Sequence, residues 1–189
     1  MAANVNHLKR TLLCLYLVCA FVPGAWADQN DFRLNGLFEE LVQADDQVTS
    51  APVEREIWRI WSESGDGDSN AIYRSGLRAM GVGDLEGAIA QFDQLVLARP
   101  RFAEGWNKRA TVLFYAERHD DSMRDIQRTL ALEPRHFGAI SGMGLIFLSR
   151  RDYAGALMAF EQVLRIHPSS EYARKQVEQL KELLSRNKA

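Results

Sequence analysis

Apolar residues recur with a helical spacing along most of the chain, and the whole pattern repeats every 34 residues. Prolines mark this period, because they recur at equal intervals at Pro100, Pro134 and Pro168. A large apolar residue stands eight positions before each proline: Phe92, Ile126 and Phe160. Self-similarity at a fixed period of this length predicts a stack of short helical units.

Three windows of the chain, 69–102, 103–136 and 137–170, align position by position. Small residues occupy the eighth and twentieth positions of each window: Gly76, Ala110, Gly144, Ala88, Ser122 and Ala156. Large residues occupy the fourth and twenty-fourth positions: Ile72, Trp106, Ile140, Phe92, Ile126 and Phe160. Small residues let two antiparallel helices approach closely, and large ones fill the space beside the contact. We therefore expect Trp106, Phe92 and Phe160 in the core.

Each window predicts a pair of helices joined by a polar turn. The expected pairs are 69–81 with 84–98, 103–117 with 120–133, and 137–150 with 153–167. An aspartate follows each turn, at Asp84, Asp120 and Asp152, and can accept hydrogen bonds from the first amides of the second helix.

This pattern resembles the tetratricopeptide-repeat (TPR) family, whose signature is W-x2-L-G-x2-Y, then A-x3-F, then P. The resemblance implies an all-α fold, a TPR α-solenoid of antiparallel helix pairs that is capped at both ends. The repeats would be TPR 1 at 69–102, TPR 2 at 103–136 and TPR 3 at 137–170. One departure is Arg109, which stands where the family prefers Leu, so its guanidinium must snorkel or find a partner.

The segments beside the repeats are also helical in pattern. Residues 28–68 predict two amphipathic helices that contain the W-x-x-W element Trp58 and Trp61. We interpret them as a helical hairpin or degenerate repeat that caps the amino-terminal end of the stack, since terminal repeats are often atypical. Residues 171–189 predict a carboxy-terminal cap helix with an apolar stripe and a charged outer face.

The first 27 residues have the pattern of a signal peptide. Lys9 and Arg10 precede a short apolar segment, 11–22, and small residues at Ala25 and Ala27 suit cleavage after Ala27. An uncleaved anchor is the alternative, but the apolar segment falls short of the roughly 20 residues that span a bilayer. We expect an exported, periplasmic protein, with secretion or anchoring by an uncleaved signal as alternatives.

Charge and cysteine content narrow the possible partners. The 189-residue chain has a formal net charge of −2, and loss of Lys9 and Arg10 would make it more acidic. An acidic chain argues against nucleic acid or an anionic membrane surface as partner. Both cysteines, Cys14 and Cys19, lie in the signal segment, so the remaining chain cannot form disulfides. After cleavage we expect no stable membrane insertion.

Residues suited to catalysis or metal binding do not form a recognisable set. The three histidines after the signal, His119, His136 and His167, lack metal-ligand spacing, and we interpret them as structural or exposed. The run 65–70 resembles a calcium loop only in part, because the glycine and glutamate that such a loop needs are replaced. A polar turn with Asp68 or Ser69 as helix N-cap is favoured. We expect no cofactor and no metal.

The family resemblance implies a concave groove lined by the first helix of each repeat. Carried onto this chain, the ligand-facing positions are Asn70, Tyr73, Leu77, Met80, Gly81, Glu104, Asn107, Thr111, Phe114, Tyr115, Gly138, Ser141, Leu145, Leu148 and Ser149. This mixture of aromatic, apolar and amide side chains suits an extended peptide or a partner helix. The alternative is that Leu77, Phe114 and Leu145 pack against the amino-terminal hairpin or the cap helix.

Two classes of function follow. Some TPR proteins bind acidic chaperone tails through a Lys at position 5 and an Asn at position 9 of the first repeat. Tyr73 and Leu77 occupy those positions here, which disfavours a cytosolic co-chaperone. The whole arrangement resembles small periplasmic TPR proteins of Gram-negative bacteria, of the kind seen in alphaproteobacteria, which implies a non-enzymatic scaffold that binds an envelope protein. The alternative is a cell-wall-acting enzyme or an accessory lobe of one.

Overall fold

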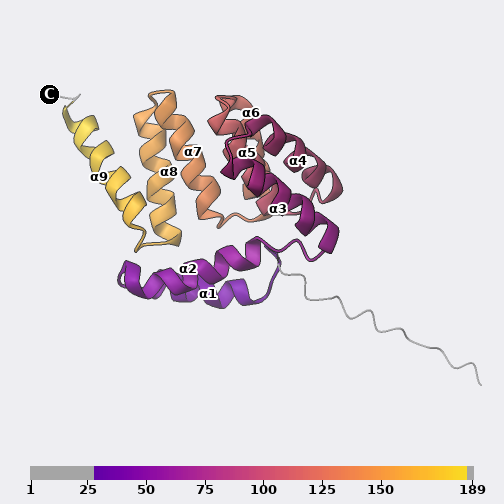
Figure 1. Cartoon of the computed structure of the whole chain (residues 1–189). Helices are drawn as coiled ribbons and strands as arrows, with labels where there is room; N and C mark the ends of the chain where they lie inside the picture. The colour runs from indigo at the N-terminus through magenta and orange to yellow at the C-terminus, as the bar shows by residue number, and fades with distance from the viewer. Residues whose placement is uncertain (1–27, 187–189) are drawn as a thin grey trace, which may run out of the picture.

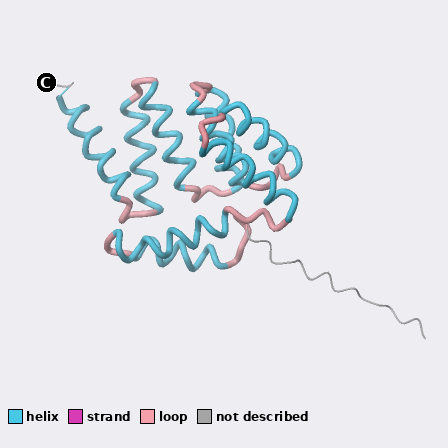
Figure 2. The backbone as a smooth tube through the Cα atoms, in the orientation of Figure 1, coloured by secondary structure: helices cyan, strands magenta, loops and turns pink. Residues whose placement is uncertain are grey.

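The structure is a computed structural model, and it describes residues 28–186. Within that range the chain is helical with no strand, which confirms the all-α prediction (Figures 1 and 2). The helices are α1 (Arg33–Gln43), α2 (Gln47–Trp61), α3 (Gly67–Gly81), α4 (Leu85–Ala98), α5 (Ala103–Tyr115), α6 (His119–Leu132), α7 (Phe137–Ser149), α8 (Tyr153–Ile166) and α9 (Glu171–Arg186). The predicted signal segment, 1–27, lies outside the described residues. Across 28–186, every helix is too short or too polar to span a membrane.

Helices α3 to α8 form three antiparallel pairs that stack side by side, and α9 packs on α8 (Figure 1). The close approach within a pair depends on the small residues that the sequence places at position 8. A Cβ at Gly76 would lie 2.6 Å from the Phe92 ring, and one at Gly144 would lie 2.8 Å from the Phe160 ring. Phe92 and Phe160 are fully buried, as predicted. The three predicted helix pairs are confirmed.

Trp106 does not lie in the core, contrary to the prediction. Its indole is half-buried and donates a hydrogen bond to the Pro100 carbonyl at 3.1 Å. The guanidinium groups of Arg109 and Arg128 lie over its ring, at 4.8 and 6.0 Å from the centroid. The difference is explained by Arg109. The Trp106 ring packs on the Arg109 guanidinium instead of entering the core.

Each turn between paired helices contains one residue with a left-handed backbone. These residues are Gly83, Glu117 and Arg151, with φ of 77°, 60° and 59°. The amide that follows each of them bonds back to a carbonyl five residues earlier, at 3.0, 2.8 and 2.9 Å. This is the Schellman arrangement that ends a helix and satisfies its last carbonyls.

Aspartates begin the second helix in repeats 1 and 3 but not in repeat 2. Asp84 and Asp152 each accept a backbone hydrogen bond at 2.9 Å, as predicted. In repeat 2, Arg118 holds the cap position without a side-chain cap, and Asp120 instead lies in the first turn of α6. The prediction for Asp120 was wrong because Asp120 stands two positions later in its repeat than Asp84 and Asp152 do in theirs.

The N-cap of α3 also differs from the prediction. Asp66 caps this helix by accepting hydrogen bonds from the amides of Asp68 and Ser69, at 3.3 and 3.2 Å. The helix therefore begins earlier than Asp68 or Ser69 as cap would allow.

The amino-terminal hairpin α1–α2 lies across the ends of the later helices and not at the amino-terminal end of the stack (Figure 1). Its buried residues share one apolar cluster with α7, α8 and α9: Leu34, Phe38, Leu41, Ile57, Ile60, Trp61, Phe137, Ile140, Ala159, Val163 and Ala173. The predicted position of this cap was therefore wrong. On α3, Arg74 and Arg78 are exposed, and a charged face of this kind does not suit burial against an apolar hairpin.

Candidate functional site

A recess of about 130 Å³ opens between α5 and α7 on the face predicted to be concave. Seven predicted groove residues line it: Asn107, Thr111, Phe114, Tyr115, Gly138, Ser141 and Leu145. The remaining lining residues are Ala110, Ser122, Ile126 and Gly142. The structure therefore brings these seven residues together at one recess.

The recess exists because α7 carries little side-chain volume where it faces α5. A Cβ at Gly142 would meet only the Ile126 Cδ1 atom, at 3.4 Å. Buried Ala110 and Ile126 form an apolar floor, and Ser122 beneath them donates its hydroxyl to the Ala110 carbonyl at 2.7 Å. The apolar floor thus lies beside a hydroxyl whose proton is already donated within the protein.

Aromatic rings stand at one end of the recess. The Phe114 ring lies 5.9 Å from the Tyr115 ring and stacks on His119 at 5.2 Å. Tyr115 is 62% exposed, so its ring is available to a partner. His119 Nδ1 lies 3.2 Å from the Ser149 hydroxyl, which ties the start of α6 to the end of α7.

The other predicted groove residues are placed differently. Leu77 and Met80 are half-buried against the Tyr73 and Phe92 cluster, and the side-chain oxygen of Asn70 accepts two hydrogen bonds from Ser64 at 2.9 Å. Leu145 and Leu148 are half-buried against a cluster formed by Ala156 and Phe160 of α8 and Val177 and Leu180 of α9. Leu145 also lines the recess, so it belongs to both the interior and the groove.

Tyr73 and Glu104 are buried and do not face an open groove, which corrects their expected exposure. The Glu104 carboxylate receives Lys108 Nζ at 3.0 Å, Asn107 Nδ2 at 2.8 Å and the Tyr73 hydroxyl at 3.2 Å. His136 Nε2 lies 3.0 Å from the same carboxylate. A buried charge needs such partners, and they hold Glu104 below the groove surface.

His136 is structural, as predicted, and it is fully buried. Its Nδ1 accepts a hydrogen bond from the Ala139 amide at 3.2 Å, so Nε2 is the nitrogen that donates to Glu104. The imidazole stacks on Trp61 with centroids 4.1 Å apart and planes at 9°. His136 therefore caps α7 and joins the hairpin to the buried carboxylate.

The charge state of Glu104 follows from its burial and from the donors around its carboxylate. Burial, the largest effect, favours the protonated acid, but the nearby Lys108 and the hydrogen bond from His136 outweigh it and lower the pKa of Glu104 to about 2. The pKa of Tyr73 is raised, first by burial and then by the charge of Glu104. An anion enclosed by four protein donors can hold structure together, but it cannot reach a solute.

Trp58 of the hairpin closes one end of the groove. A Cβ at Gly138 would lie 2.5 Å from the Trp58 ring, and Lys108 Nζ lies 5.2 Å from the ring centroid. The Trp58 ring also meets Phe137 edge-on at 5.3 Å. The groove is therefore filled by the hairpin at the start of α7 and open farther along this helix.

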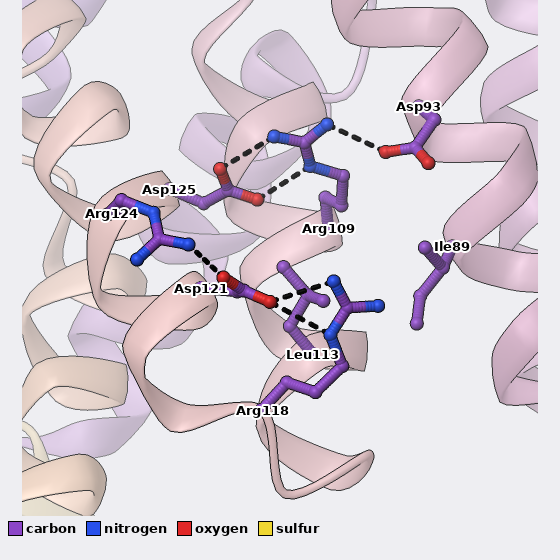
Figure 3. A pocket seen from close by; sticks show the side chains of 8 residues that line it. All are labelled: Ile89, Asp93, Arg109, Leu113, Arg118, Asp121, Arg124 and Asp125. Carbon is purple, nitrogen blue, oxygen red and sulfur yellow. Dashed lines mark hydrogen bonds and ion pairs between the residues drawn. The ribbon is translucent and has the colours of Figure 1, made fainter.

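Sequence reasoning missed a charged pocket of about 180 Å³ between α4, α5 and α6 (Figure 3). Arg109 binds Asp125 through two hydrogen bonds of 2.7 Å and Asp93 through one of 2.7 Å. Asp121 pairs with Arg118 and Arg124. The charged side chains of this pocket are thus paired within the protein, which indicates a structural role. Arg109, which stands where the family prefers Leu, was the sequence signal that could have located the pocket.

No group of three or more His, Cys, Asp or Glu side chains in residues 28–186 is arranged to hold a metal ion.

Comparisons with known proteins agree with this geometry. A model of the tetratricopeptide repeat family matches residues 73–123 and 107–171. A TPR repeat-containing protein of Rhizobium etli is 34% identical over 156 residues, which cover 82% of this chain and 76% of that protein.

Two solved structures show the same fold at lower identity. The Sgt2 TPR domain from Aspergillus fumigatus is 21% identical with a TM-score of 0.61, covering 66% of this chain and 84% of that one. The first TPR of Spaghetti (RPAP3), bound to the HSP90 peptide SRMEEVD, is 19% identical with a TM-score of 0.59. That match covers 62% of this chain and 93% of the other.

Proposed function

The chain belongs to the tetratricopeptide-repeat family, and we propose that it is a non-enzymatic scaffold that holds a segment of a protein partner in the groove between α5 and α7. The observation that carries this proposal is the open recess, where exposed Tyr115 and half-buried Phe114 stand beside an apolar floor. Aromatic side chains beside a desolvated pocket are typical binding hot spots.

The peptide complex of the similar RPAP3 domain supports a peptide as the kind of ligand. The peptide in that complex contains three acidic residues in its sequence SRMEEVD. This chain has Tyr73, Asn107 and Ser141 at the fifth position of its repeats, none of them a cation. We therefore propose a partner other than an acidic chaperone tail.

The cellular setting is also a proposal, and it depends on the sequence pattern of residues 1–27. We propose export to the periplasm and a partner among envelope proteins, with a role in envelope assembly or integrity. Mass spectrometry of the protein from the envelope fraction tests this. A chain that begins at or beside Asp28 supports export with cleavage, whereas an intact amino terminus contradicts it.

A cross-linking pull-down from the envelope fraction tests the groove itself. Phe114 and Tyr115 are replaced together by Ala, since Tyr73 is buried and its loss would disturb the fold. Leu97→Ala serves as control, because Leu97 is 81% exposed on α4 and lies outside the recess. We expect the double variant to lose the partner and the control to keep it.

Two outcomes would contradict the proposal. If the double variant retrieves the same proteins as the unaltered chain, the groove is not the binding surface. If the purified protein instead degrades cell-wall fragments, the scaffold role is wrong and the enzymatic alternative is correct.

A further inference from the structure

We infer that the recess between α5 and α7 recognises its partner by taking up one uncharged apolar side chain from an extended segment. This inference rests on the proposed function and specifies the chemistry of the ligand. It is carried by the volume of the recess, the charges around it and the free acceptor atoms on its rim.

The volume and lining of the recess suit a side chain of the size of leucine or phenylalanine. An engineered apolar cavity of about 150 Å³ accommodates a benzene molecule. The recess here measures about 130 Å³, and its floor consists of Ala110, Ile126 and the backbone at Gly142. An apolar group that entered would lose contact with water and gain contact with these atoms.

The charges around the recess disfavour an ionic ligand. Each of the described residues that line it is uncharged. Asn107, which lines the recess, donates a hydrogen bond to Glu104, but the charge of Glu104 is already balanced by Lys108 at 3.0 Å. A carboxylate or an ammonium group placed here would lose its water without gaining an opposite charge.

The polar rim presents hydrogen-bond acceptors. The hydroxyls of Thr111 and Ser141 donate to carbonyls of their own helices, at 2.9 and 2.8 Å, which leaves their oxygens able to accept. Asn107 is buried, at 5% exposure, and its side-chain nitrogen donates to Glu104, so only its side-chain oxygen is left to accept a hydrogen bond from a group inside the recess. Acceptors suit the N–H groups of an extended backbone beside the buried side chain.

The two ends of the groove limit how the segment lies. Trp58 blocks the end at Gly138, so the segment must continue past Tyr115. Tyr115, which lines the recess and is 62% exposed, is therefore the aromatic residue that the segment passes.

The inference is tested by selecting peptides that bind the unaltered chain and comparing their binding to a variant in which the recess is filled. The purified full-length chain is used to select from a phage-displayed library of random heptapeptides, and enriched peptides are synthesised with amidated carboxyl ends. Their dissociation constants are then measured by fluorescence anisotropy for the unaltered chain, for Gly142→Leu and for Gly36→Leu. Gly142→Leu fills the recess, while Gly36→Leu makes the same change on α1, where a Cβ would meet nothing within 4 Å.

We expect the enriched peptides to share a leucine-like or aromatic residue among uncharged neighbours. Gly142→Leu should weaken their binding at least about tenfold, as the loss of one buried apolar side chain does, and Gly36→Leu should leave it within about twofold. Circular dichroism melts confirm that both variants are folded. Replacing the shared apolar residue of the peptide by Asp should abolish binding.

Other results would overturn the inference, and they separate it from the proposed function. Enrichment of acidic peptides, or equal binding by Gly142→Leu, would leave a peptide-binding groove but not this recess. A dimer that Gly142→Leu abolishes would make a second copy of the chain the occupant. Failure to enrich any peptide would remove both the groove and the recess as peptide sites.

Discussion

Glu104 shows how one residue can leave its expected surface position and become part of the interior. The equivalent positions in repeats 1 and 3 hold Asn70 and Gly138. The Glu104 side chain is fully buried, and Lys108 and His136 offset the cost of burial, which lowers the pKa of its carboxyl to about 2. A carboxylate with a lowered pKa stabilises the folded state only while it is ionised.

Stability at acid pH should therefore depend on Glu104. In the unfolded chain its pKa is near the ordinary value of 4.5. The stabilisation is complete above that pH and is lost as the pH falls from about 4.5 towards 2. Over this range the carboxyl is protonated in the unfolded chain but still ionised in the folded protein, which favours unfolding as the pH falls. Urea unfolding of the unaltered chain should show a steeper loss of stability over this range than Glu104→Gln. Parallel curves for the two proteins would contradict the assignment.

The sequence predicted some of these residue roles and not others. Position 7 of repeat 2 predicted that Arg109 needs partners, and the two aspartates provide them. The burial of Glu104 and Tyr73 was not predictable from the repeat frame. It depends on hydrogen bonds that join Glu104 to Tyr73 and to His136, which lie 31 and 32 positions away in sequence and contact it only in the folded chain.

Among the structural elements, the turns inside the repeats carry a local strain that one substitution can relieve. Glu117 and Arg151 have φ near 60°, a conformation that costs an L-residue roughly 1–2 kcal/mol and costs glycine little. Gly83 holds the same position in repeat 1. We expect Glu117→Gly to stabilise the protein by about 0.5 to 1 kcal/mol. This gain is smaller than the relieved strain because glycine has more conformational freedom in the unfolded chain, which opposes folding.

Urea unfolding measures this effect, and Gly83→Ala is its counterpart. That variant should be destabilised by roughly 1 kcal/mol because alanine must adopt the left-handed conformation. Destabilisation by Glu117→Gly would show that the Glu117 side chain contributes more than its backbone strain costs.

The hairpin packs on the later helices through an apolar cluster that includes Trp61. Its ring is 1% exposed and stacks on His136. Truncating it to Ala should cost about 3 to 5 kcal/mol, as other large-to-small core changes do. Hydrogen exchange should then rise first in α1 and α2. Exchange that rises equally in α4 would show that the hairpin and the repeats unfold as one unit.

Helix positions could be predicted from the sequence, but the place of the hairpin could not. A helical period shows which face of α1 and α2 is apolar, yet it does not say which other apolar surface this face will cover. Both the amino-terminal end of the stack and the ends of α7 to α9 were possible. The exposed arginines of α3, Arg74 and Arg78, were the signal against the first choice.

For the whole molecule, stability should be uneven along the stack. In repeat proteins each unit is stabilised mainly by its neighbours. Helices α7 and α8 pack against α6, α9 and the hairpin, whereas α3 and α4 have a repeat neighbour only in α5. We expect amide protection in native-state hydrogen exchange to be highest in α7 and α8 and lowest in α3 and α4. Equal protection throughout would indicate a single cooperative unit.

The position of the hairpin also has a consequence for the order in which the chain can fold. Contacts within the stack are local in sequence, but the hydrogen bond between Asn35 and Arg135 joins residues 100 positions apart. Until α7 has formed, Trp58 and Trp61 lack His136 and Phe137, the residues of the repeats on which they pack, and helices of this length are marginal alone. The first helices of the chain are therefore among the last to find their place.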